Sequence, residues 1–277
     1  MMIVSDTDDS PWVVFELQSQ LYAINTRHVR EMIEIPKHTV LPEAASDIRG
    51  VIDLRGEIAV LLDTRQRLGM ASLEQETHAL IDLLEAREQD HVNWLEALET
   101  ALREESTFHL TTDPHRCAFG QWYDHFHTDN PLLQNQLQAF DKPHKALHAL
   151  GVDLIRMSEN GERELALHRL EQARGSTLKR LKALFAETRA FLRASVREIA
   201  LVLDWDGQLV ALSVDKVTAV EYLDEEGRQS APDMGEVGTR CVNEIGRRKD
   251  SEQMVQLLDL EALLLPLRSS QALGLAA

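Results

Sequence analysis

Three histidines and one cysteine in the middle of the chain have the residue types and spacing of a metal site. They are His91, Cys117, His144 and His148. Three imidazole nitrogens and one thiolate sulfur favour tetrahedral zinc over calcium or magnesium, which prefer oxygen ligands. Because a catalytic zinc ion keeps one position open for water, four protein ligands predict a structural or sensing site.

The sequence around the histidines is helical in pattern. His144 and His148 are four residues apart, so both rings project from one face of a helix. His91 lies on a stripe of apolar residues that recur at three- and four-residue steps over residues 80–102, which predicts one long amphipathic helix. We therefore expect helices to bring the ligands together.

The surroundings of Cys117 and His91 offer further candidates. Cys117 follows Pro114 near a predicted helix start, where the helix dipole and a metal ion both favour a thiolate. Asp90 is either an acceptor for an imidazole N–H or an exposed helix charge. Other histidines crowd the same region and are expected mostly at the surface, although one of them could replace a ligand under oxidation: His109, His115, His125 and His127.

Composition excludes several functional classes. The 277 residues are 44% hydrophobic and 27% charged, as in an ordinary globular protein of two domains or of one domain with a large insertion. The formal net charge of -17 argues against nucleic-acid binding, which needs clustered Lys and Arg. No apolar run approaches the roughly 20 residues that span a bilayer, and the acidic start does not resemble a signal peptide. We therefore expect a cytoplasmic protein, in which Cys117 binds metal and Cys241 is a buried free thiol.

The chain changes character twice, which predicts an α+β fold with three segments. Residues 1–72 contain short strand-like runs, residues 73–197 are helical, and residues 198–277 return to strands. The predicted strands are 12–17, 51–54, 58–62, 198–204, 208–215, 217–222 and 254–260. The simplest arrangement is an antiparallel helical bundle inserted into one β domain.

Two glycines mark local features. Gly56, between two of the strand-like runs, predicts a tight hairpin turn with positive φ. Gly175 and Ser176 interrupt the helical pattern of residues 163–197 and predict a bend or a break there.

The β segments resemble the CheW family, the coupling proteins of bacterial chemotaxis arrays. The resemblance is carried by Ile-Arg-Gly-Val-Ile-Asp-Leu-Arg-Gly-Glu over residues 48–57, with looser matches over 58–69, 210–217 and 257–261. It implies two small five-stranded β-barrels with a groove between them, and binding to a chemotaxis histidine kinase (CheA-like) and to a methyl-accepting chemoreceptor. Arg55 is either an interface residue or a surface ion pair. Ala59 and Thr64 depart from the family pattern, which usually has Pro and an apolar residue there.

The helical segment resembles the chemoreceptor zinc-binding (CZB) domain. The matching residues are Asp90-His91 with Trp94, residues 117–123 (Cys-Ala-Phe-Gly-Gln-Trp-Tyr), and Pro143-His144 with His148. The resemblance implies that His91, Cys117, His144 and His148 bind Zn²⁺. It also implies a helical bundle that often forms a homodimer and that senses zinc or oxidants.

Three functional hypotheses follow. The first is a non-enzymatic signalling adaptor in which the zinc site senses zinc or an oxidant such as hypochlorite. The second is the same adaptor with purely structural zinc. The third is a zinc hydrolase, which is disfavoured because Lys145 stands where a His-Glu-x-x-His metallopeptidase has its catalytic Glu.

Overall fold

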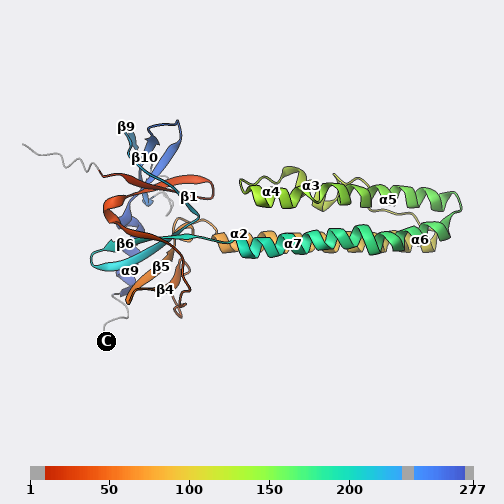
Figure 1. Cartoon of the computed structure of the whole chain (residues 1–277), viewed down its shortest axis with the longest axis horizontal. Coiled ribbons are helices and arrows are strands. Elements are labelled where there is room, and N and C mark those ends of the chain that lie inside the picture. Colours follow the sequence, from red (N-terminus) through yellow and green to blue (C-terminus); the bar gives the residue numbers. More distant parts are fainter. Residues whose placement is uncertain (1–9, 233–239, 272–277) are drawn as a thin grey trace, which may run out of the picture. The chain divides into compact units, whose positions relative to one another are not determined.

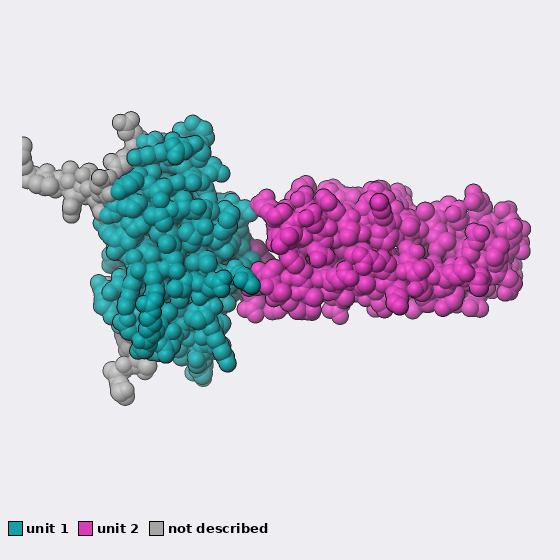
Figure 2. All heavy atoms as spheres, in the orientation of Figure 1, with its two compact units in different colours: residues 1–73, 197–277 teal, residues 74–196 magenta. Residues whose placement is uncertain are grey.

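The computed structural model describes residues 10–232 and 240–271, and the chain divides into two compact units. One unit joins residues 1–73 with residues 197–277, and the other consists of residues 74–196 (Figure 2). We call them the β unit and the helical unit. Because the helical unit lies between two sequence segments of the β unit, it is an insertion into the β fold.

The β unit contains two sheets (Figure 1). The six-stranded sheet has the order β8-β1-β2-β11-β10-β9, with bounds Lys216–Glu221, Trp12–Leu17, Gln20–Asn25, Met254–Leu258, Val242–Arg248 and Leu223–Ser230. The five-stranded sheet has the order β3-β6-β7-β5-β4, with bounds Val29–Glu34, Ile199–Trp205, Gln208–Val214, Glu57–Asp63 and Ile48–Leu54. The resemblance implied five strands in each part, but one of the two sheets has six.

Parallel pairing joins the two flanking segments into one fold. Strand β2 pairs with β11 through Ala23 and Leu257, and β5 pairs with β7 through Leu61 and Ala211. All four side chains are at most 1% exposed. A parallel pair cannot be closed by a tight turn, and the connection from β5 to β7 contains the whole helical unit.

The predicted hairpin between β4 and β5 is confirmed. Leu54 pairs with Glu57, and the turn residues Arg55 and Gly56 have φ angles of 58° and 93°. The last predicted strand is too long, because β11 ends at Leu258 and helix α9 (Leu260–Gln271) follows. Asp259 caps that helix by accepting the Ala262 N–H at 3.1 Å. Two short helices complete the unit: η1 (Thr26–His28) and α1 (Thr64–Arg67).

The helical unit consists of α2 (Leu73–Glu104), α3 (Ala118–His125), α4 (Pro131–Gln138), α5 (Asp141–Glu159), α6 (Arg163–Ala173), the π-helical turn η2 (Arg174–Leu178) and α7 (Lys179–Ser195). The long helix predicted over residues 80–102 is confirmed within α2. The interruption predicted at Gly175 and Ser176 is a π-helical turn, which joins α6 to α7 without ending the helix. A short connection folds α6 back onto α5, and ion pairs join α7 and η2 to α2: Arg189 with Glu88, and Arg174 with Glu99.

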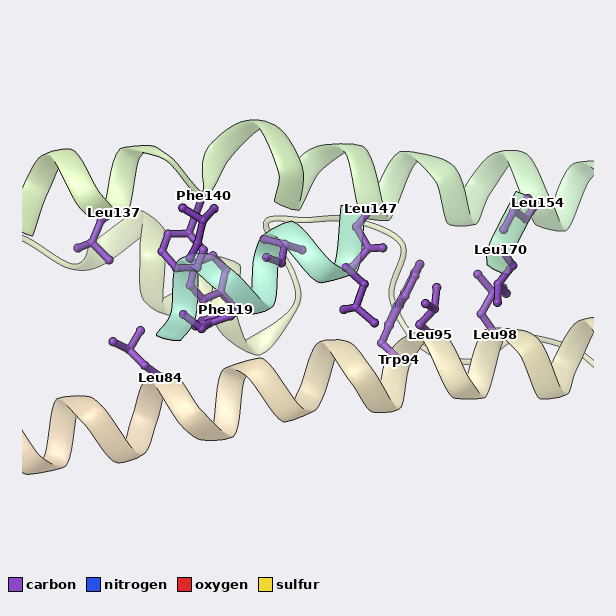
Figure 3. Close-up of a cluster of buried hydrophobic side chains, with 14 of the residues drawn as sticks. Leu84, Trp94, Leu95, Leu98, Phe119, Leu137, Phe140, Leu147, Leu154 and Leu170 are labelled. Carbon is purple, nitrogen blue, oxygen red and sulfur yellow. The ribbon is translucent and has the colours of Figure 1, made fainter. Parts of the chain in front are cut away.

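The core of the helical unit runs along α2 and the helices packed on it (Figure 3). Leu84, Leu95 and Leu98 of α2 are fully buried. Trp94 lies against Gly151 of α5, where a Cβ would be 2.4 Å from the indole ring. Gly151 therefore permits the close approach of α5 to α2 beside the histidines.

Candidate metal centre

Helix α2 fixes the orientation of His91. Its ring is 4% exposed, and Nδ1 donates to the backbone carbonyl of Arg87 at 2.7 Å. Because a carbonyl can only accept, this hydrogen bond leaves Nε2 as the lone-pair nitrogen. That Nε2 atom is buried without a hydrogen-bonding partner. A buried acceptor without a donor is costly, so this atom fits a metal ligand.

Cys117 is the N-cap residue of α3. Its Sγ accepts the backbone N–H of Gly120 at 3.2 Å, and the thiol donates to the Pro114 carbonyl at 3.4 Å. A Cβ at Gly120 would lie 1.8 Å from the Pro114 oxygen, so only glycine lets the preceding loop fold this closely over the helix start. The cap and the loop together hold the sulfur in place.

Helix α5 carries the other two ligands one turn apart. His144 and His148 are 4% and 1% exposed, and their ring centroids lie 4.8 Å apart. The Nε2 atom of His144 is 3.2 Å from Cys117 Sγ. Both ring nitrogens of His148 are buried, and the backbone of Thr111 interacts with the ring. The sequence step of four residues therefore places both rings toward Cys117 and His91.

The structure brings these four predicted ligands into one cluster. One ligand atom from each of His91, Cys117, His144 and His148 can be chosen so that all lie within 4.8 Å of one another. Ligand atoms around tetrahedral zinc are about 3.3 to 3.7 Å apart, given bonds of about 2.0 to 2.3 Å. The cluster is slightly wider than that, and small side-chain rotations would close it. The unpartnered Nε2 atom of His91 and the donor types both fit zinc.

Burial sets the protonation of the cluster without metal. It lowers the pKa of His144 to about 3 and that of His148 to about 4, and it also lowers the pKa of His91. Burial raises the pKa of the Cys117 thiol, and the N–H groups of Gly120 and Phe119 only partly oppose this. At neutral pH the imidazoles are therefore ready to bind metal, while the thiol must release a proton.

Aromatic side chains enclose the cluster on one side. Phe119 lies 4.9 Å from the His144 ring and 5.6 Å from the His91 ring, measured between centroids. Phe140 and Phe185 pack on Phe119 at 5.3 Å and 5.4 Å. Figure 3 labels Phe119 and Phe140 in this core. Such a shell excludes water and strengthens the binding of a cation by the thiolate.

Asp90 does not accept a hydrogen bond from a ligand imidazole. It forms an ion pair with Arg87 at 3.1 Å, and its side chain is 47% exposed. The carbonyl one turn before His91 is nearer to the ring and takes that role, which no residue type in the sequence could reveal. The other four histidines of this region are exposed, as predicted: His109, His115, His125 and His127.

The remaining predicted residues lie in the β unit. Arg55 is at the tip of the β4–β5 hairpin, its side chain is 88% exposed, and Nη2 lies 3.4 Å from Glu31 Oε2. Cys241 is 3% exposed within an apolar cluster, in agreement with the prediction of a buried thiol. Within the described residues, no helix is both long and apolar enough to cross a membrane.

Two family models match parts of the chain. The CheW-like domain family matches residues 11–92, and the chemoreceptor zinc-binding domain family matches residues 91–155. None of the curated proteins matches the chain. Among solved structures, the chain is similar to the scaffolding protein TtCheW from Thermoanaerobacter tengcongensis, with 14% identity, a TM-score of 0.44, and coverage of 95% of this chain and 93% of that chain. Residues 11–92 thus carry a match to the CheW-like domain family, and residues 91–155 carry a match to the chemoreceptor zinc-binding domain family.

Proposed function

We propose that this chain is a chemotaxis coupling protein whose helical unit binds zinc through His91, Cys117, His144 and His148. The observation that carries the proposal is the convergence of the four ligand atoms within 4.8 Å in a buried site. Zinc bound there would supply a positive charge that keeps the Cys117 sulfur as a thiolate and cross-links the segments that hold the ligands.

Metal analysis of the purified protein tests the site. We expect about one zinc ion per chain, as a four-ligand site implies. Cys117→Ala and His148→Ala should lose it, whereas His125→Ala, at an exposed position on α3, should keep it. Zinc content that is independent of both ligand residues would contradict the assignment.

The β unit would bind a CheA-like histidine kinase and a methyl-accepting chemoreceptor. The CheW-like match supports this, and the exposed side chain of Arg55 on a well-defined hairpin is a suitable contact. Capture of kinase and receptor on the immobilised protein is the test. Arg55→Glu should weaken capture, whereas Lys216→Glu, an exposed charge of the other sheet, serves as control. Equal capture by both variants would remove Arg55 from the interface.

Oxidation of Cys117 would convert the zinc site into a sensor. The thiolate sulfur attacks the chlorine of hypochlorous acid and displaces hydroxide. Water then hydrolyses the sulfenyl chloride to a sulfenic acid and releases chloride and a proton. The sulfur loses two electrons, which reduce the chlorine to chloride. A sulfenic acid is a weaker ligand than a thiolate, so oxidation weakens zinc binding.

Kinase activity in a reconstituted array separates sensing from purely structural zinc. We expect hypochlorite to release zinc and to change kinase activity with the wild-type protein but not with Cys117→Ser. Zinc that stays bound under oxidation, with unchanged kinase activity, would favour the structural alternative. We propose no enzymatic activity, because Lys145, at the position of a metallopeptidase Glu, forms an ion pair with Asp141 at 2.7 Å.

The helical unit would also form a homodimer. The resemblance to the chemoreceptor zinc-binding domain supports this, and Leu132, Val152 and Leu165, which are 61%, 49% and 47% exposed, are candidate contacts with a second copy. Sedimentation of the protein over a concentration series would detect a dimer. A monomer at every concentration would contradict this part of the proposal.

A further inference from the structure

A pocket of about 400 Å³ in the helical unit reaches the metal cluster from one side. Three of the four ligand residues lie on its wall: His91, Cys117 and His148. The lining also contains Asn93 and Leu110, which are both exposed at the surface. The pocket therefore extends from exposed residues to the side chains that hold the metal.

The other side of the cluster is closed. Phe119 lines the pocket, Phe140 and Phe185 pack on Phe119 without lining it, and all three are at most 1% exposed. His144, the ligand that does not line the pocket, has its ring 4.9 Å from Phe119. Cys117 remains partly exposed despite these neighbours. An incoming molecule thus meets the sulfur from the side of the pocket.

We infer that this pocket is the exchange path of the metal site, through which zinc enters and leaves and small electrophiles reach Cys117 Sγ. The inference rests on the proposed zinc function and adds the route to it. One water molecule occupies about 30 Å³ of liquid, so the pocket has room for a hydrated zinc ion or for hypochlorous acid. Its lining includes the apolar Trp94 and Leu110 as well as the charged Asp90 and Arg116, and the apolar part of the wall favours small neutral electrophiles over large charged ones.

Two tryptophan variants on one helix face provide a matched test. Asn93 lines the pocket, whereas Gln89, one turn earlier on α2, does not. Their side chains share a hydrogen bond of 2.8 Å, so Asn93→Trp and Gln89→Trp both break it, and both positions are exposed. Only Asn93→Trp places an indole ring in the path. Leu110→Ala is the opposite change, because it widens the path.

Two rates are measured for each variant: zinc release to an excess of chromophoric chelator, and alkylation of Cys117 by iodoacetamide in metal-free protein. In the alkylation the Cys117 thiol first loses its proton to solvent. The sulfur then forms a bond to the carbon of iodoacetamide that carries iodine, the carbon–iodine bond breaks and iodide leaves. Peptide mass mapping separates Cys117 from the buried Cys241. We expect Asn93→Trp to slow both rates about tenfold, equivalent to about 1.4 kcal/mol of barrier.

The equilibrium zinc affinity of Asn93→Trp should stay at the wild-type value, because a blocked path slows entry and release alike. Leu110→Ala should accelerate both rates, and Gln89→Trp should leave both unchanged. Equal rates for Asn93→Trp and Gln89→Trp would overturn the exchange path. If the wild-type protein bound no zinc, the proposed metal function would fail, but the alkylation rates would still decide whether the pocket leads to Cys117.

Discussion

Substitution of Cys117 separates two roles that the structure gives to one side chain. The sulfur caps α3 by accepting the Gly120 N–H at 3.2 Å, and it is also a predicted zinc ligand. Serine is one of the preferred N-cap residues, whereas alanine has no acceptor. Cys117→Ser therefore keeps the cap and weakens the metal site, and Cys117→Ala removes both.

The expected magnitudes differ with and without metal. In the presence of a chelator, Cys117→Ser should leave the free energy of unfolding within about 1 kcal/mol of wild type, whereas Cys117→Ala should lower it by about 0.5 to 2 kcal/mol, the usual cost of a lost cap. With free zinc at 100 times its dissociation constant, the wild-type helical unit should gain about 2.7 kcal/mol. Both variants should lose most of this gain.

Denaturant unfolding followed by circular dichroism at a helix-sensitive wavelength measures these differences, because the long helices lie in the helical unit. The series is run with chelator and with buffered zinc. Two results would refute the reasoning. One is that zinc stabilises the wild type and both variants equally. The other is that, in the presence of chelator, Cys117→Ser loses as much free energy of unfolding as Cys117→Ala.

Three further changes should have measurable effects on the helical unit. Gly151→Ala should destabilise the helical unit by about 1 to 3 kcal/mol, the usual range for overpacking, because the new methyl group would lie 2.4 Å from Trp94. An unchanged denaturant unfolding curve would contradict this. Phe185→Ala should lower the free energy of unfolding by about 3 to 5 kcal/mol, because the ring is fully buried. Denaturant unfolding checks this, with Glu187→Ala at an exposed position of α7 as control. Without metal, the free energy of unfolding should be retained above pH 6.5 and should fall below that pH. The reason is that His144 and His148 take up protons near pH 6.5 in the unfolded chain, whereas burial lowers their pKa values in the folded protein to about 3 and about 4. The loss of unfolding free energy should approach about 1.4 kcal/mol per pH unit for each histidine. A free energy of unfolding that stays constant between pH 6.5 and pH 4.5 would contradict this.

Part of the candidate metal site could be predicted from the sequence because it depends on local geometry. A step of four residues places His144 and His148 on one helix face, and the apolar stripe of α2 includes His91. The same holds for the turn at Gly56, whose positive φ the sequence predicts. Each of these predictions needs only a few neighbouring residues.

Features that depend on distant contacts could not be predicted. Strands β2 and β3 carry mixed polar and apolar residues, and their pairing with β11 and β6 joins segments more than a hundred residues apart. The acceptor for His91 is a backbone carbonyl, and every residue has one, so the sequence could not single it out and left Asp90 as either an acceptor or an exposed charge. The capping role of Asp259 was hidden because the apolar run around it suits a strand and a helix equally well.

Helix α7 donates no ligand but still contacts the cluster. Phe185 of α7 lies 5.9 Å from the His91 ring and 5.4 Å from Phe119, and Phe119 lies two residues after Cys117. Any change in the position of α3 or of His91 must therefore alter the packing of Phe185, because a buried aromatic cluster has little free volume. The chain leaves α7 at Ser195 and enters β6 at Ile199. Phe185 thus links α7, the helix that precedes β6, to both His91 and Phe119.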